Sequence, residues 1–211
     1  MISFTFLAVA TFVLTILMNI IRKNSTVVTI FQIASIFAAF ALISLGVAEN
    51  TYGLIVAGIL SLVVKAFIAP TFLQDLIKKY DGYFSAPSYL SVPLTLVVLA
   101  ILTAFSRFVI FTSVPTVENT TVAALFLASI FGMFFFMINR RGTLSQIVGI
   151  LGMENNIVLI TVFLGIEHSI ALELAVSFDI LVWVAIAITF LTLIYRQFGS
   201  METSMTHLKE E

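Results

Sequence analysis

Four ionisable side chains lie inside long apolar runs of this sequence: Lys65, Glu154, Glu173 and Asp179. A charged group near the centre of a bilayer costs a few kcal/mol on insertion scales, so such groups usually face protein or water and usually have a function. Carboxyl groups at this depth can bind and release protons, and a lysine can pair with them. The four residues therefore predict proton-handling chemistry within a membrane.

Glu154 lies near the centre of its apolar run, about 15 Å from either end of a helix that rises 1.5 Å per residue. On the same helix, Gly149, Gly152 and Asn156 are spaced at i, i+3 and i+7. They form a stripe suited to close contact between helices. Glu154 is about 200° around the helix from Gly152, so it points nearly the opposite way. We expect a helix enclosed by protein and a Glu154 that exchanges protons. The alternative is a protonated Glu154 that serves only packing.

Lys65 shares a helix face with Gly58 and Ser61, which makes a polar groove on that helix. A carboxylate partner would keep this lysine charged, and either Glu154 or Asp179 could supply one. Such a pair can act as a switch, because a proton on the acid weakens the pairing. The alternative is a static ion pair with a structural role only.

Asp179 lies nine residues into the last apolar run, at a depth similar to that of Glu154, and we expect it to be a second proton site. Glu173 lies about 9 Å nearer the outer face and about 120° around the helix. It could connect the path to that face or hold an interfacial position. Arg107, four residues from the outer end of its run, is expected to extend toward the interface in a structural role.

The composition defines the elements that must position these groups. The chain has 211 residues, of which 61% are hydrophobic and 10% are charged, whereas a soluble domain has about 25% charged residues. The sequence has no basic patch that would indicate nucleic-acid binding, and it has no cysteine. A membrane span needs roughly 20 apolar residues, and seven runs provide this: 2–21, 26–47, 52–77, 91–111, 121–138, 144–164 and 170–195. We predict an all-α polytopic membrane protein with seven transmembrane helices.

The charges of the loops predict the topology. Alternate loops and the end of the last span carry the basic residues, namely Arg22, Lys23, Lys78, Lys79, Arg140, Arg141 and Arg196. The other loops carry Glu49, Glu118 and Glu167 and no Lys or Arg. By the positive-inside rule the N-terminus is outside and the C-terminus is cytoplasmic. Pro70 predicts a break in the third span near residues 66–70, with the remainder along the cytoplasmic interface.

Several of these segments resemble the hydrogenase-4 component E family, a membrane subunit of group 4 [NiFe] hydrogenase and formate hydrogenlyase complexes. The resemblance covers essentially the whole chain, including the polar tail that ends His207-Leu-Lys-Glu. It rests on three features in order: Lys65-Ala-Phe-Ile-Ala-Pro70, the segment Arg140-Arg141…Gln146-Ile-Val-Gly149…Met153-Glu154-Asn155, and Glu173 with Asp179 six residues later.

The last three spans are also similar to the K subunit of respiratory complex I and the C subunit of multisubunit cation/proton antiporters. In those families a glutamate follows a basic loop in the second helix and another acid occupies the third helix. Glu154 and Asp179 match these two places. The chain departs from the pattern in that the last acid is Asp, and in that Glu154 follows the Arg-Arg pair about three residues later than expected.

The resemblance implies a multi-pass subunit of a bacterial or archaeal cytoplasmic (inner) membrane, not an enzyme by itself and without a cofactor of its own. Larger antiporter-like membrane subunits and a soluble redox module with nickel–iron and iron–sulfur centres would be its partners. The expected organisation is a four-helix N-terminal half (1–111), an outer loop (112–120), a three-helix region similar to the K subunit (121–198) and a polar cytoplasmic tail (199–211). The transported ion could be H⁺ or Na⁺, since a carboxylate suits both.

Other functions stay open. The chain could be a subunit of a cation/proton antiporter, or a structural anchor whose buried charges serve assembly. It could also be a free-standing small carrier, for which a weak internal repeat is the support. A shift of 118 residues superimposes Arg22-Lys23 on Arg140-Arg141 and Thr71-Phe72-Leu73 on Thr189-Phe190-Leu191.

Overall fold

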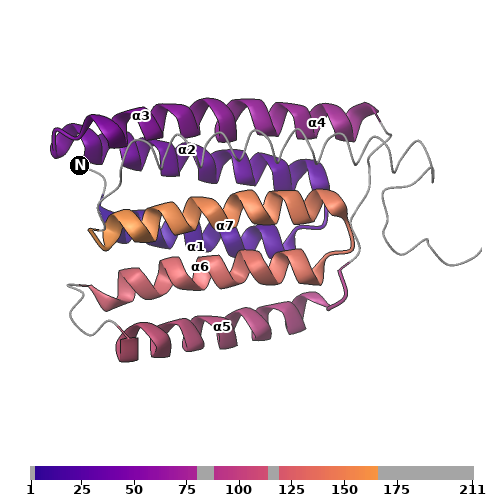
Figure 1. The fold of residues 1–211 in the computed structure, drawn as a ribbon. Coiled ribbons are helices and arrows are strands. Elements are labelled where there is room, and N and C mark those ends of the chain that lie inside the picture. Colours follow the sequence, from indigo (N-terminus) through magenta and orange to yellow (C-terminus); the bar gives the residue numbers. More distant parts are fainter. Residues whose placement is uncertain (1–2, 80–87, 114–118, 166–211) are drawn as a thin grey trace, which may run out of the picture.

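The computed structural model describes residues 3–79, 88–113 and 119–165, and these residues are almost entirely helical. The helices are α1 (Phe4–Ile20), α2 (Asn24–Ala48), α3 (Tyr52–Ser61), the π-helical segment η1 (Leu62–Ile68), α4 (Ala69–Lys79), α5 (Val92–Ser113), α6 (Thr120–Asn139) and α7 (Thr143–Phe163). Figure 1 shows them lying side by side as a bundle of rods.

Among residues 3–79, 88–113 and 119–165, five helical spans are long and apolar enough to cross a membrane, which confirms the predicted membrane class. They are Asn24–Ala48, Tyr52–Asp75, Val92–Ser113, Thr120–Asn139 and Leu144–Phe163. The first predicted span appears as α1, an apolar helix of 17 residues. The α1 helix is thus slightly shorter than the roughly 20 apolar residues that a membrane span needs. The seventh predicted span, 170–195, lies outside the described residues, as does the repeat segment Thr189-Phe190-Leu191.

Consecutive spans run in opposite directions (Figure 1). The α1–α2 and α6–α7 connections lie at one end of the bundle, together with the end of α4, whereas the α2–α3 connection lies at the other end. The basic residues Arg22, Lys23, Lys78, Arg140 and Arg141 therefore gather at one end, and Glu49 lies at the opposite end. The structure thus reproduces the alternation of charge on which the predicted topology depends.

The core is built around α6, which packs against α7, α5 and α1. The largest cluster of buried side chains draws on α1, α2, α6 and α7, with Met18, Phe31, Phe136 and Val148 all at most 2% exposed. Because α1 packs against α6 and α2 packs against α7, the predicted N-terminal half and the following three-helix region share one core.

Arg140 joins α6 to the end of α1. Its guanidinium donates hydrogen bonds to the carbonyl oxygens of Met18 (3.0 Å) and Ile21, and a longer one to that of Arg22 (3.5 Å). These carbonyls lie in the last turn of α1 or just after it, where the helix itself offers no donors. Burial, and then the nearby charge of Arg22, lower the pKa of Arg140 to about 10, so it stays charged at neutral pH.

The predicted break at Pro70 is wrong. Residues 62–68 form a π-helical segment that continues directly into α4, and α3, η1 and α4 follow one line in Figure 1. Proline has no N–H to donate to the carbonyl four residues earlier. Here that carbonyl, Ala66 O, accepts a hydrogen bond of 2.9 Å from Gln32 Nε2 on α2. The helix therefore continues because a neighbour supplies the donor that Pro70 lacks.

Two buried glycines on different interfaces provide a test of this packing. A Cβ on Gly58 would lie 2.6 Å from Ile43 Cγ1 and 3.0 Å from the α2 backbone, whereas one on Gly152 would meet the methyl end of Met133 at 2.4 Å. Backbone cannot yield, but the end of a methionine can. We expect Gly58→Ala to cost about 1–3 kcal/mol and Gly152→Ala to cost less than about 1 kcal/mol. Unfolding of both variants in mixed micelles measures the difference; equal losses would contradict the packing.

Candidate functional site

Lys65 and Glu154 form an ion pair inside the bundle. Lys65 Nζ donates to Glu154 Oε1 over 2.8 Å, and the two side chains are 5% and 19% exposed. The two residues are far apart in the sequence and come from the third and sixth spans. The sequence allowed Glu154 or Asp179 as the partner of Lys65. The structure shows the pair with Glu154, and Asp179 lies outside the described residues.

Glu154 lies at mid-depth in α7, and the opposite face of this helix packs against α6. Gly149 and Gly152 lie against Met137 and Met133 of α6, so close that a Cβ on either glycine would overlap those side chains. This confirms the predicted close helix contact at Gly149 and Gly152. Glu154 consequently points away from α6 and toward η1. It is about 14 Å from the helix end at Phe163 and about 17 Å from that at Thr143.

The α2 helix holds the backbone next to both members of the pair. Ala66, which directly follows Lys65, accepts the hydrogen bond from Gln32. Asn155, which directly follows Glu154, donates from Nδ2 to Ser35 Oγ over 2.9 Å. Gln32 and Ser35 lie one turn apart on α2, so one face of this helix connects η1 to α7. The pair is thus held in place by a third helix that contributes no charge.

Gln32 and Ser35 were not predicted as site residues. Both are polar residues three positions apart within an apolar run, which is the signal that could have indicated them. A second signal is Pro70, because the carbonyl it frees belongs to residue 66 and needs a donor from another helix. Only the packing of α2 between η1 and α7 shows where that donor comes from.

Two buried amide oxygens belong to the residues that follow Glu154 in α7. Asn155 and Asn156 are 4% and 5% exposed, and within the described residues their Oδ1 atoms have no hydrogen-bond partner. The Nδ2 of Asn156 donates back to Gly152 O over 2.8 Å. Buried oxygens of this kind are acceptors for internal water or another donor. Asn155 Oδ1 thus offers an acceptor on the residue directly after Glu154.

The other two predicted site residues, Glu173 and Asp179, lie outside the described residues. Arg107 is exposed on α5, away from the ion pair, as expected for an arginine that extends toward the interface. Across residues 3–79, 88–113 and 119–165, no three or more His, Cys, Asp or Glu side chains gather in a way that could hold a metal ion.

The chain was also compared with known proteins. No family model, no curated protein and no solved structure matches it.

Proposed function

We propose that the protein is a non-catalytic membrane subunit of a complex I-like redox assembly of the group 4 hydrogenase type, in which it carries part of a proton path. Glu154 and Asp179 are the exchangeable proton sites, Lys65 is the charge partner that tunes Glu154, and Glu173 connects the path toward the outer face. The electron-transferring nickel–iron and iron–sulfur centres belong to partner subunits. The N-terminus is outside and seven helices cross the membrane.

One observation carries this proposal: a lysine and a glutamate pair at 2.8 Å near the middle of helices that are apolar enough to span a membrane. A buried pair is costly to form, because desolvation of two charges offsets most of their attraction. Packing alone would be served as well by two apolar side chains. A titratable pair at this depth is better explained by a function that uses its charge.

The geometry suits proton exchange. Protonation of Glu154 removes the negative charge that faces Lys65 Nζ, so the pair weakens as the proton arrives and re-forms as it leaves. The hydrogen bonds from Gln32 and Asn155 hold the two backbones through α2 while this happens. Within the part of the chain that the structure describes, Asn155 Oδ1 has no donor, and it provides an acceptor one residue beyond the carboxylate.

The partners test the proposal first. A tagged full-length chain is purified from its native membranes in mild detergent, and the proteins that accompany it are identified by mass spectrometry. We expect antiporter-like membrane subunits together with a soluble redox module in stable stoichiometry.

Two outcomes would contradict this expectation. Antiporter-like subunits without a redox module would point to a cation/proton antiporter. A monodisperse chain without partners would contradict the proposal that the protein belongs to a redox complex and would favour a small carrier. A matched preparation from cells expressing the tag on an unrelated polytopic protein excludes proteins that bind the resin or the detergent micelle.

A further inference from the structure

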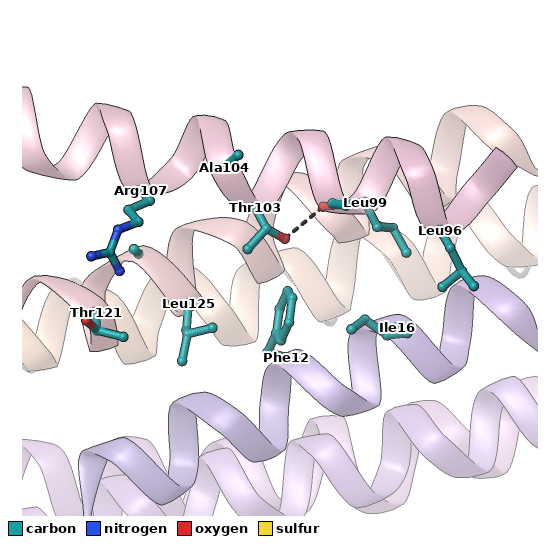
Figure 2. Close-up of a pocket in the computed structure, with 11 residues that line it drawn as sticks. Phe12, Ile16, Leu96, Leu99, Thr103, Ala104, Arg107, Thr121 and Leu125 are labelled. Carbon is teal, nitrogen blue, oxygen red and sulfur yellow. Dashed lines mark hydrogen bonds between the residues drawn. The ribbon is translucent and has the colours of Figure 1, made fainter. Parts of the chain in front are cut away.

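A groove runs along the outside of the bundle where α5 and α1 meet over α6. It has a volume of about 480 Å³ and is lined by apolar side chains, among them Phe12 and Ile16 of α1, Leu96 and Leu99 of α5, and Leu125 of α6. Figure 2 shows these side chains facing a common space between the three helices. The helix α5 lies at the edge of the described helices in Figure 1, so the groove is on the outside of their bundle.

The polar atoms of the groove are concentrated at one end. Arg107 points along the groove wall toward Thr121, in the first turn of α6 (Figure 2). Halfway along the groove, the Thr103 hydroxyl donates to Leu99 O of its own helix over 2.7 Å. Its hydrogen bond is thus made within α5, and the groove surface there is apolar. Within the described residues, Arg107 has no ion-pair partner. The groove thus combines an apolar channel with a single cation at the end near the loop between α5 and α6.

The dimensions favour an acyl chain as the occupant. From Leu96 to Arg107 the groove follows eleven residues of α5, about 16 Å, which is close to half of the ~30 Å hydrocarbon thickness. A helix of that length and ~10 Å diameter would occupy roughly 1,300 Å³, well above 480 Å³. A single hydrocarbon chain roughly 5 Å across, given carbon contacts near 4 Å, needs only about 300 Å³.

We propose that this groove binds a phospholipid with an anionic headgroup. One acyl chain lies between α1 and α5 along one leaflet. The phosphate lies at the Arg107 end, where the guanidinium offers several donors to phosphate oxygens. Arg107 therefore belongs to a lipid-binding site that is independent of the Lys65–Glu154 pair and of the proposed proton path.

Native mass spectrometry of the full-length chain, with any subunits that copurify, tests the site. The protein is released from nanodiscs that contain phosphatidylglycerol and phosphatidylcholine in equal amounts, and the lipids retained are counted. We expect the wild-type protein to retain phosphatidylglycerol preferentially. In Arg107→Gln this preference should fall roughly five-fold, the effect of one basic residue at a membrane surface, whereas Arg107→Lys should keep most of it.

A second pair of variants tests the apolar part. Ala104→Trp places a large ring within the groove and should reduce retention of both lipids, while Ile101→Trp on the exposed face of the same helix should not. Lys78→Gln, an exposed basic residue outside the groove, is the charge control. Thermal unfolding of each variant shows that the bundle is intact.

Two results would overturn the proposal. One is unchanged lipid preference in Arg107→Gln together with unchanged retention in Ala104→Trp. The other is a photo-crosslinker at position 104 that reacts with a copurified protein or a second copy of the chain instead of lipid, which would show that a polypeptide covers the groove.

Discussion

Replacing Glu154 by glutamine is expected to leave the protein assembled with its partners and to reduce proton translocation by about 100-fold, the lower end of what a positioned proton-transferring group contributes. The amide of glutamine keeps an oxygen that can accept the hydrogen bond from Lys65 Nζ, now 2.8 Å to the carboxylate. It cannot take up or release a proton at any physiological pH. The variant therefore separates the shape of the site from its chemistry.

Proton uptake by inverted membrane vesicles or proteoliposomes, driven by the redox partner and followed with a pH-sensitive dye, measures this effect. Glu49→Gln is the matched control, because Glu49 is an exposed acid at one end of the bundle. Its translocation should equal that of the wild-type protein. Loss of assembly in Glu154→Gln, with normal translocation in whatever complex remains, would show that the ion pair only holds helices together.

Replacing Lys65 by methionine is expected to destabilise the bundle by roughly 3–5 kcal/mol, the usual cost of removing one partner of a buried ion pair. The carboxylate of Glu154 would lose the cation that faces it inside apolar helices. Replacing both residues by methionine should recover most of this loss, because an apolar pair of similar volume is often as stable as the ion pair it replaces. The coupling energy of the pair is the difference between the loss in the double variant and the sum of the losses in Lys65→Met and Glu154→Met.

Unfolding by sodium dodecyl sulfate in mixed micelles, followed by circular dichroism, measures the free energy of unfolding. The double-mutant cycle consists of the wild-type protein, Lys65→Met, Glu154→Met and the double variant. Lys23→Met is the control, since Lys23 is exposed beside the short α1–α2 connection and its loss should cost less than about 0.5 kcal/mol. If the Lys65 and Glu154 losses simply add in the double variant, then the two side chains are not coupled, and the proposed switch has no basis.

The helices were predictable because apolar runs and short polar separators are local features. The predicted run 26–47 corresponds to α2 at Asn24–Ala48, and 121–138 corresponds to α6 at Thr120–Asn139. Charge alternation likewise placed the basic loops at one end. These features follow from the thickness and low dielectric constant of the bilayer, which constrain each span independently of the other spans.

The site was only partly predictable, because pairing between spans depends on packing. Lys65 was known to need a carboxylate, but sequence alone left Glu154 and Asp179 as equal choices. The helix phase of Gly149 and Gly152 turned Glu154 away from α6, yet it could not reveal that η1 lies opposite. The failure at Pro70 has the same origin: a local rule predicts a break, and Gln32 from another helix removes the reason for it.

The π-helical segment also sets the phase of the third span. Its backbone bond from Ala69 N to Val64 O spans five residues instead of four, which accommodates one extra residue in that turn. The exposed stripe of the span changes spacing accordingly, from three or four residues to five at its last step: Val56, Ile59, Val63, Phe67 and Phe72.

The extra residue keeps this stripe on one azimuth and keeps Ala69 and Leu73 in the core. Inserting one further residue between 66 and 68 would leave the hydropathy of the span almost unchanged. Because this turn already holds one extra residue, the insertion would rotate everything after it by about 100°, carrying Leu73 out of the core and Phe72 toward it. The orientation of α4 is thus sensitive to single-residue insertions in this short stretch.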